Sequence, residues 1–381
     1  MKKWYGENFK LGILGGGQLG RMFIQEAINY NVHVAILEGS KKVPCGDIAS
    51  EFVVGNIKDY DDVLNFGRNM DVLTVEIEHV NVDALKQLEK EGVKVFPQPD
   101  VLKIIQDKGL QKQFYTENNI PTAPFSLVDT AQGLDALNLE FPFVQKLRKG
   151  GYDGKGVKLI NSSEQLNDVF DAPAVIEKFV PFEKELSVIV ARNESGEIKS
   201  FPVVECEFNE KLNLVEFLFA PAAIPQEIEN NAKLIAQKVI NAFGMVGILA
   251  VELFLTKDGD LLVNEVAPRP HNSGHHTIEC NFTSQFEQHL RSITDQPLGS
   301  TDIVLPGVMI NLIGAEGFGG AAFVDNLDLI MKTKGAYLHN YGKQITKPNR
   351  KMGHITVVNK DINEAKQIAR ELLDKIRIIS K

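Results

Sequence analysis

Residues 252–265 read ELFLTKDGDLLVNE: two apolar runs flank an Asp-Gly pair, and a glutamate stands at each end. Asp-Gly between alternating apolar residues is a strong short-range signal for a β-hairpin. If Asp258 and Gly259 form a two-residue turn, the register places Glu252 directly opposite Glu265. The sequence therefore predicts two carboxylates facing each other on one side of a hairpin.

Two facing carboxylates destabilise a sheet unless a cation lies between them. Paired oxygen ligands suit a Mg²⁺ ion that also holds phosphate groups. Phe254 shares the predicted face, where it would pack near a base or simply join the core. Two solvated surface glutamates are the alternative, but residues 264–277, NEVAPRPHNSGHHT, form a dense polar loop directly after the second strand. Functional groups collect in such loops, which favours a metal site.

Bulk composition narrows the class of protein. The 381 residues predict two or three domains, and 44% hydrophobic with 24% charged residues is ordinary for a globular protein. A net charge of −9 argues against nucleic-acid binding, and no apolar run approaches the length of a membrane span. The first ten residues lack an apolar signal core, and the three cysteines are widely spaced, so we expect a cytoplasmic protein.

The first part of the chain alternates strand and helix patterns. Strands are predicted at residues 10–14, 32–37, 51–54, 71–75 and 93–96. This alternation predicts a Rossmann-like α/β domain with a parallel sheet over residues 1–99, ending at Pro97-Gln98-Pro99.

Two further regions follow. Residues 100–297 mix hairpins with helices at 107–114 and 227–243, which predicts an α+β domain. Residues 298–381 predict a small third domain, with strands at 303–312, 336–339 and 354–358 and a last helix at 363–377.

The glycine loop of the first domain allows two interpretations. Gly15, Gly17 and Gly20 match G-x-G-x-x-G between a strand and a helix, and Glu38 ends the second strand near the spacing of a ribose-binding acid. An NAD-dependent dehydrogenase is therefore one hypothesis. The same loop would also serve another anion at a helix N-terminus, or close packing of strand on helix.

Residues 142–157 suggest ATP chemistry. Lys146 lies near the end of a predicted strand, and residues 149–157, KGGYDGKGV, form a flexible loop whose N–H groups could close over phosphates. A plain glycine-rich hairpin is the alternative, and no Walker A motif is present.

Residues 175–181, VIEKFVP, are an apolar strand interrupted by a Glu-Lys pair. Backbone groups at such a strand end can read an adenine edge, and Glu185 could accept a hydrogen bond from a ribose hydroxyl. The alternative for Glu177 and Glu185 is ordinary surface charge.

Cations gather near the C-terminus, at His339, Lys343, Lys347, Arg350 and Lys351. In an acidic protein such a cluster suggests an anionic ligand, with a solvated basic turn as the alternative.

Together these motifs resemble the ATP-grasp superfamily and, within it, the family of 5-(carboxyamino)imidazole ribonucleotide synthases of purine biosynthesis. The motifs that carry the resemblance are GGGQLGRM at 15–22, Glu-x-Glu at 76–78, GGYDGKG at 150–156 and NEVAPRPHNSGH at 264–275. They occur in the expected order over essentially the whole chain, and the last one is long and specific.

The resemblance implies a preATP-grasp domain at 1–99, an ATP-grasp domain at 100–297, a small C-terminal domain at 298–381, and a homodimer. The implied reaction joins bicarbonate to the exocyclic amine of aminoimidazole ribonucleotide and cleaves ATP to ADP and phosphate. Only small molecules are implied as ligands, with neither nucleic acid nor membrane.

The resemblance also implies roles for individual residues. Those implied to bind ATP are Lys108, Lys146, Gly151, Tyr152, Asp153, Gly154, Lys155, Gly156, Val157, Glu177, Lys178, Phe179, Val180, Glu185, Phe208, Phe254, Asn264 and Glu265. Those implied to bind the ribonucleotide or bicarbonate are Gln18, Leu19, Glu76, Tyr152, Asp153, Arg269, His271, Asn272, Lys343, Arg350 and Lys351. The implied catalytic residues are Lys146, Asp153 and Arg269, and the implied Mg²⁺ ligands are Glu252 and Glu265.

Two positions depart from the family pattern. Relatives carry Asn-x-His where this chain reads Glu205-Cys206-Glu207-Phe208, so a family histidine near the nucleotide is replaced by Phe208. His79 also stands where asparagine is usual.

Four other functions fit parts of the sequence. A formate-dependent ribonucleotide transformylase and a biotin-type carboxylase share the ATP machinery, although the second is typically longer. A dehydrogenase would bind nicotinamide at residues 15–20. A catalytically inactive nucleotide sensor is disfavoured, because the predicted metal carboxylates and the lysines of the loop at residues 149–157 are present.

Overall fold

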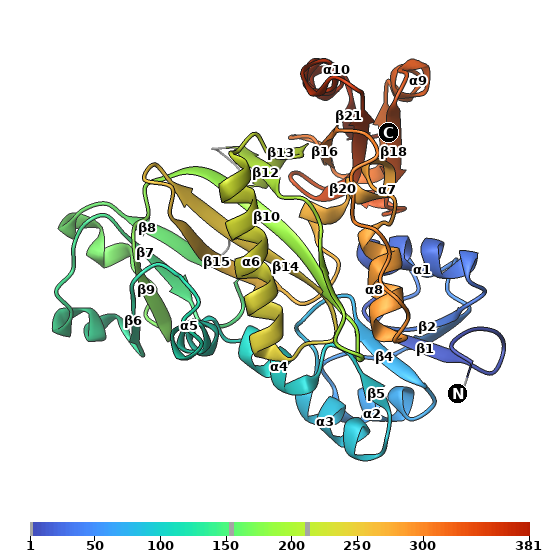
Figure 1. Ribbon diagram of the computed structural model, residues 1–381, viewed down its shortest axis with the longest axis horizontal. Helices are drawn as coiled ribbons and strands as arrows, with labels where there is room; N and C mark the ends of the chain where they lie inside the picture. Colours follow the sequence, from blue (N-terminus) through green and yellow to red (C-terminus); the bar gives the residue numbers. More distant parts are fainter. Residues whose placement is uncertain (1–2, 152–155, 210–213) are drawn as a thin grey trace.

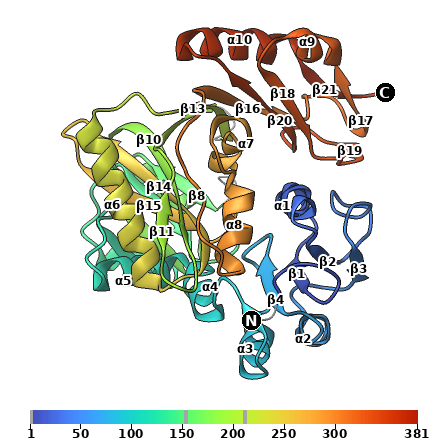
Figure 2. The same ribbon diagram turned by 45° about the vertical axis from the view of Figure 1, so that its right-hand side comes forward.

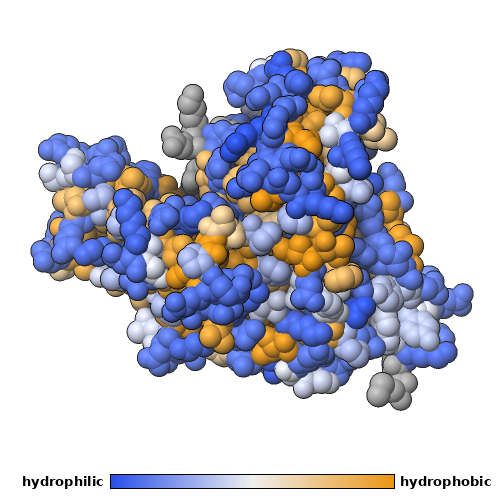
Figure 3. All heavy atoms as spheres, turned by 45° about the horizontal axis from the view of Figure 1, so that its top comes forward, coloured by the Kyte–Doolittle hydropathy of each residue, from blue (hydrophilic) through white to orange (hydrophobic). Residues whose placement is uncertain are grey.

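The computed structural model describes residues 3–151, 156–209 and 214–381. In Figure 1 the blue N-terminal part lies at the lower right, the orange-to-red C-terminal part lies above it, and a smaller green sheet lies at the opposite, left-hand end of the molecule. Seen from another side, the C-terminal part stands above the N-terminal sheet (Figure 2). The face shown in Figure 3 is largely hydrophilic, with separate apolar patches. In the part of the chain that is described, no helix combines the length and the apolar character needed to cross a membrane.

The N-terminal part is a parallel sheet, as predicted. Its strand order is β3 (Glu51–Val54), β2 (His33–Glu38), β1 (Lys10–Leu14), β4 (Val72–Val75) and β5 (Lys94–Val95). Helix α1 (Gln18–Asn29) covers one face, while α2 (Tyr60–Gly67) and α3 (Val82–Lys90) cover the other. The inner strands β1 and β4 are almost wholly apolar because both of their faces are buried. The loops after β1, β2 and β4 therefore meet at one sheet edge, where ligands bind in such folds.

A small antiparallel sheet follows helices α4 (Pro99–Ile105) and α5 (Lys108–Glu117). Its order is β6 (Phe125–Val128), β9 (Ala174–Lys178), β7 (Phe143–Leu147) and β8 (Val157–Ile160). Two short 3₁₀ turns, at Ala131–Ala136 and Ser163–Asp168, connect its strands.

The central antiparallel sheet has the order β15 (Leu261–Ala267), β14 (Gly247–Thr256), β10 (Phe182–Arg192), β12 (Val204–Asn209), β13 (Leu214–Ala220), β16 (Gly307–Ile313), β20 (Lys351–Val358) and β18 (Ala336–Asn340). Strand β11 (Ile198–Ser200) pairs with β10. Helix α6 (Gln226–Phe243) packs on this sheet, and α8 (Gln285–Ile293) contacts both this sheet and α1. The predicted third region thus contributes three strands to a sheet that begins in the second region. The proposed boundaries at 99 and 297 remain predictions.

The remaining C-terminal elements pack near β16 and β20 of the central sheet. Helix α10 (Ile362–Lys375) packs on β16 and β20, near α9 (Leu327–Lys332). Strands β19 (Ile345–Thr346), β17 (Gly320–Asp325) and β21 (Arg377–Ser380) form a small sheet. Several predicted bounds differ from the structure. The strand expected near 303 begins at Gly307, and the last helix, expected to end at about Arg377, ends at Lys375 because Arg377 already pairs in β21.

The hairpin at residues 252–265 exists, but its predicted turn was wrong. Leu255 pairs with Leu261, and Thr256 N donates to Asp260 O (2.9 Å), which leaves a three-residue loop. This register alone would put Glu252 opposite Asn264. The register shifts again between Leu253 and Val251, which pairs with Val266. Asn264 and Glu265 together therefore oppose Glu252 in a β-bulge.

Candidate active site

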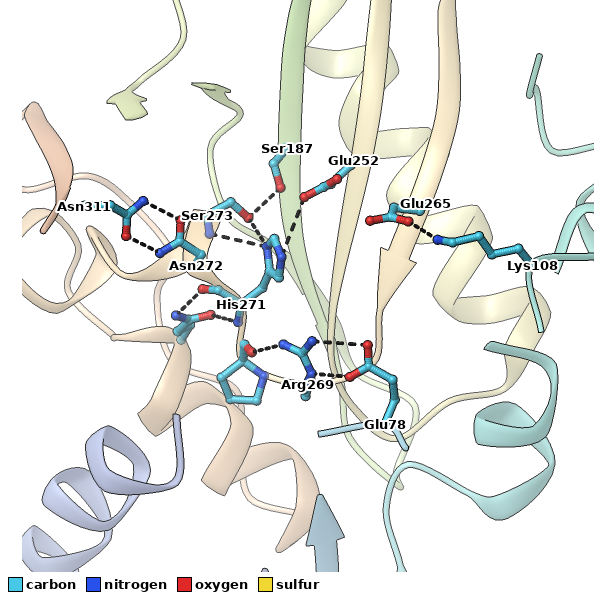
Figure 4. A network of polar contacts seen from close by, with 12 residues as sticks. Glu78, Lys108, Ser187, Glu252, Glu265, Arg269, His271, Asn272, Ser273 and Asn311 are labelled. Atoms are coloured by element: carbon cyan, nitrogen blue, oxygen red, sulfur yellow. Dashed lines mark hydrogen bonds and ion pairs between the residues drawn. The ribbon is translucent and has the colours of Figure 1, made fainter. Parts of the chain in front are cut away.

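A cleft of about 500 Å³ lies where the three predicted regions meet. Its walls combine the carboxyl edge of the parallel sheet, the start of α5, the end of β15 with the loop that follows, and the start of β20. The polar residues among its lining are Gln18, Lys58, Glu76, Glu78, His79, Gln106, Lys108, Gln111, Arg148, Glu265, Arg269, His271, Asn272, His275 and Lys351. Figure 4 shows a network of polar contacts from this region.

The bulge brings the two predicted metal carboxylates together. Glu265 forms an ion pair with Lys108 at the start of α5, and Glu252 lies on the neighbouring strand (Figure 4). Burial raises the pKa of Glu252, and the charges of Glu265 and Glu185 raise it further. The Lys108 ammonium holds the pKa of Glu265 low. Two partly buried carboxylates with mutual repulsion are hard oxygen donors that one cation would satisfy, so these residues fit Mg²⁺.

Lys146 is held by a buried ion-pair network. Its Nζ lies 2.8 Å from Oε2 of Glu177 and 2.7 Å from Oδ1 of Asn264. Lys112 of α5, which sequence reasoning missed, reaches Oε1 of Glu177 at 2.8 Å. Burial alone would raise the pKa of Glu177, but the two ammonium groups outweigh burial and lower it. The surface-charge interpretation of Glu177 was wrong, because this residue is 3% exposed.

Arg269 makes a forked contact with Glu78. Its Nε donates to Oε2 at 2.6 Å and its Nη2 donates to Oε1 at 3.2 Å. Burial would raise the pKa of Glu78, but Arg269 outweighs burial and lowers it to about 2. The Glu-x-Glu motif at 76–78 predicted no role for Glu78. Its structural partner is thus 191 residues away along the chain.

In the glycine loop of the first domain, residues 15–20, two carboxylates already accept hydrogen bonds from the backbone N–H groups. Glu38 accepts from Gly16 N (3.1 Å), and Glu76 accepts from Leu19 N (3.1 Å) at the start of α1. A Cβ at Gly17 would lie 2.4 Å from Oε1 of Glu76, so this glycine is needed for the close approach. Burial raises the pKa of Glu76 to about 7. Because protein carboxylates occupy these donors, the arrangement disfavours a dinucleotide pyrophosphate there.

The polar loop after β15 is rigidly held. Gln285 binds the backbone of His271 on both sides, accepting from N (2.9 Å) and donating to O (2.8 Å). The side-chain amide of Asn272 exchanges two hydrogen bonds with Asn311 of β16 (2.8 and 2.9 Å). Burial lowers the pKa of His271 to about 3. Asn311, which ties this loop to the C-terminal part, had no sequence signal.

The predicted cationic cluster near the C-terminus does not act as one group in the structure. Lys351 lines the cleft, and the Nζ of Lys343 donates to the backbone oxygen of Lys351 (2.7 Å). Arg350 is exposed, with its guanidinium donating to Ile345 O (2.6 Å). His339 contacts a carboxylate of the protein instead, because its Nε2 lies 2.6 Å from Oε1 of Glu279.

Residues predicted for the nucleotide lie around the central sheet. Phe254 stacks on Phe182 with ring centroids 4.6 Å apart, and Glu185 pairs with Phe254 across β10 and β14. Burial raises the pKa of Glu185 to about 7. Phe208 lies on β12, and Lys178 ends β9 just before Phe179 and Val180.

The glycine loop after β7 is described only at its ends. Gly151 lines the cleft, and Gly156 and Val157 lead into β8. Tyr152, Asp153, Gly154 and Lys155 were also predicted site residues, and they lie outside the described residues.

Family models match most of the chain. A ribonucleotide synthetase preATP-grasp domain matches residues 9–106, an ATP-grasp domain matches 113–286, and a phosphoribosylaminoimidazole carboxylase C-terminal domain matches 307–368. With the cleft between them, these three parts define an ATP-grasp ligase, a class of enzyme that uses ATP with Mg²⁺.

Individual relatives narrow the class. The N5-carboxyaminoimidazole ribonucleotide synthase of Bacillus subtilis is 37% identical over 93% of this chain and 92% of its own length. The phosphoribosylaminoimidazole carboxylase of Saccharomyces cerevisiae is 37% identical over 94% of this chain, which spans 65% of that longer protein.

Solved structures that resemble this chain belong to the same family as these relatives. The N5-carboxyaminoimidazole ribonucleotide synthetase of Thermotoga maritima is 42% identical, with a TM-score of 0.91 and coverage of 98% of this chain and 100% of that one. The synthase of Aspergillus clavatus in complex with ADP and 5-aminoimidazole ribonucleotide is 33% identical, with a TM-score of 0.87 and coverage of 96% and 98%. The chain therefore belongs to the N5-carboxyaminoimidazole ribonucleotide synthase family, as its motifs predicted.

Proposed function

We propose that this protein carboxylates 5-aminoimidazole ribonucleotide with bicarbonate, cleaving ATP to ADP and phosphate, as a step of purine biosynthesis. The observation that carries the proposal is the meeting of three groups in one cleft: Glu265 with Lys108, the forked Arg269–Glu78 pair, and Lys351, with Glu252 on the strand beside Glu265. A phosphate-binding region, an anion-binding region and a second cationic wall are what a ligase needs to hold ATP, bicarbonate and a phosphorylated nucleotide together. The family relatives named for this reaction support the same conclusion.

We assign the ATP phosphates to Lys108 and Lys146. Mg²⁺ would be held by Glu252 and Glu265, with Asn264 adjacent in the bulge. When bound, it supplies positive charge that offsets the charge developing on the transferred phosphoryl group. The role of Glu177 is to hold Lys146 in place through its side chain, while residues 177–180 offer backbone groups to the adenine. Glu185 is assigned to the ribose.

In the first half of the reaction, bicarbonate attacks the γ-phosphorus of ATP and ADP leaves, which forms carboxyphosphate. Arg269, fixed by Glu78, orients the bicarbonate-derived anion. Carboxyphosphate then passes its carboxyl group to the exocyclic amine, and phosphate leaves. We assign Asp153 to orienting or deprotonating the amine and Lys351 to the ribonucleotide phosphate. The loop from Gly151 to Val157 is assigned to excluding water, because carboxyphosphate hydrolyses.

The test is ADP release measured with ATP, aminoimidazole ribonucleotide and bicarbonate, each omitted in turn. We expect full turnover only with all three, and no turnover when formate replaces bicarbonate. Equal ADP release with formate would favour a transformylase, and release that is independent of the ribonucleotide would exclude the proposed reaction.

We also propose that the protein is a cytoplasmic homodimer. Cys45, Cys206 and Cys280 are free thiols in the described chain, two of them buried, which suits a reducing compartment. The dimer rests on the family resemblance, and light scattering tests it directly: a mass near 42.3 kDa would exclude it.

A further inference from the structure

A chain of polar contacts leads from the core of the central sheet to the predicted bicarbonate region. Ser187 Oγ lies 2.7 Å from Ser273 Oγ, and Ser273 Oγ lies 2.9 Å from Nδ1 of His271. On the other side of the ring, Nε2 lies 3.6 Å from Oε1 of Glu252 (Figure 4). Both serines are buried, at 0% and 2% exposure, so no bulk water competes for these contacts.

One contact decides where the ring proton sits. The backbone N–H of Ser273 donates to Nδ1 of His271 (3.3 Å), where the imidazole caps the short turn Asn272–Gly274. A backbone N–H can only donate, so Nδ1 must offer its lone pair and cannot carry a proton. The proton of the neutral ring is therefore on Nε2.

The direction of the other bonds follows from the same fact. Because Nδ1 accepts, the Ser273 hydroxyl must donate its single proton to Nδ1. Ser187 must then donate to Ser273. All the donors point the same way, so each bond polarises the next. Gln285 fixes the backbone of His271 on both sides, which leaves the ring little freedom to turn over.

The Nε2–H is left facing the cleft. Its distance to Glu252 exceeds a hydrogen bond, so it can reach an oxygen atom placed between the two side chains. Extending the proposed function, on which this step rests, we propose that Ser187 and Ser273 are positioning residues that hold His271 as an Nε2–H donor to an oxygen of the bicarbonate-derived anion. In this state His271 is neither the base that takes the amine proton nor a metal ligand through Nε2.

The first test needs no substrate. With histidines labelled with ¹⁵N, and the His271 signals assigned from His271→Gln, NMR of the wild-type protein should show the proton on Nε2 and a bare Nδ1. A ring protonated on Nδ1 would overturn the inference whatever reaction the protein catalyses. Ser273→Ala keeps the backbone N–H and should retain this tautomer, but it should shift the Nδ1 signal because the hydroxyl donor is lost; an unshifted Nδ1 signal would show that the Ser273 hydroxyl does not hold the ring.

The second test is kinetic. Ser273→Ala should lower kcat/KM for bicarbonate roughly tenfold, Ser187→Ala should lower it less, and Ser187→Thr, which retains the hydroxyl, should restore it. The KM for ATP should stay within about twofold. The matched control is Ser292→Ala, which removes an equally buried hydroxyl that donates to Gln288 O in α8.

The outcomes separate the two proposals. If Ser292→Ala and Ser273→Ala lower turnover equally, or if the Thr variant keeps the full defect, the serines have only a structural role and the inference fails. If the wild-type protein shows no bicarbonate-dependent ADP release, the proposed function fails, while the NMR result still decides the tautomer.

Discussion

Lys146 and Glu177 lie on the neighbouring antiparallel strands β7 and β9, with Nζ 2.8 Å from Oε2, and both side chains are at most 10% exposed. Lys112 contacts the other carboxylate oxygen, so a single acid compensates two buried ammonium groups. A buried charge without a partner is costly, so removing any one of the three residues should destabilise the protein.

Glu177→Gln should therefore destabilise the protein by about 3 kcal/mol, because it leaves two ammonium groups facing each other. Chemical unfolding of the variant and the parent measures the difference. The control is Glu140→Gln, which breaks the exposed Lys178–Glu140 pair beside the same strand and should leave stability unchanged. Equal effects of the two substitutions would mean that the buried network does not carry this energy.

Glu265→Ala should lower ATP cleavage by about 100-fold or more, since it removes one of the two proposed Mg²⁺ ligands. ADP release at saturating ATP, over a series of Mg²⁺ concentrations, is the measurement. Asp258→Ala, at the exposed tip of the same hairpin, serves as the control and should retain parental activity. Substantial cleavage by the Glu265 variant would remove this residue from the metal site.

Arg269→Lys should lower kcat/KM for bicarbonate by about 100-fold, although the charge is kept, because an ammonium cannot reproduce the fork on Glu78. Arg68→Lys is a matched control: Arg68 makes the same fork with Glu91 (2.8 and 2.9 Å) on the surface, away from the cleft. Similar losses in both variants, or none in Arg269→Lys, would contradict the proposed orienting role.

Glu76 should give the protein a distinctive pH dependence. Its pKa of about 7 when folded lies above the ordinary value of 4.5. Between these values the folded state keeps a proton that the unfolded chain has released, so this residue makes stability fall as pH rises from about 4.5 to 7.

Glu76→Gln mimics the protonated acid and still accepts from Leu19 N. Its free energy of unfolding should nearly match the parent near pH 4.5 and exceed it by about 3 kcal/mol at pH 8. Denaturant curves at both pH values provide the measurement. A difference between variant and parent that does not change with pH would show that Glu76 is not protonated at neutral pH.

Lys351→Ala should raise the KM for the ribonucleotide about tenfold, with a smaller change in kcat, because it removes a phosphate partner without touching the ATP site. Steady-state kinetics with varied ribonucleotide measures both constants. Lys360→Ala, just beyond the opposite end of β20, removes an exposed lysine and should change neither. An unchanged KM in Lys351→Ala would take this residue out of the substrate pocket.

Local patterns predicted much of the fold. The apolar runs at 10–14 and 72–75 indicated buried parallel strands, and the Asp-Gly pair indicated the hairpin. These features depend on neighbours in the sequence: side-chain periodicity, turn residues and helix caps. The Glu252–Glu265 pairing was also expected, but for an incomplete reason, since a longer turn displaced the register and a bulge at Asn264 and Glu265 restored it.

Tertiary structure decided which distant groups meet. Glu177 lies in an apolar strand, yet only packing of α5 against β9 supplies Lys112 and turns a surface-like acid into a buried one. Glu78 acquires a role from Arg269, and the tautomer of His271 depends on the backbone N–H of Ser273. No local pattern encodes these contacts, because burial and the choice of partner depend on how sheets and helices dock. The sequence by itself therefore determined the strands, the helices and the chemical inventory of the site, and the docked fold determined which of those groups face each other in the cleft.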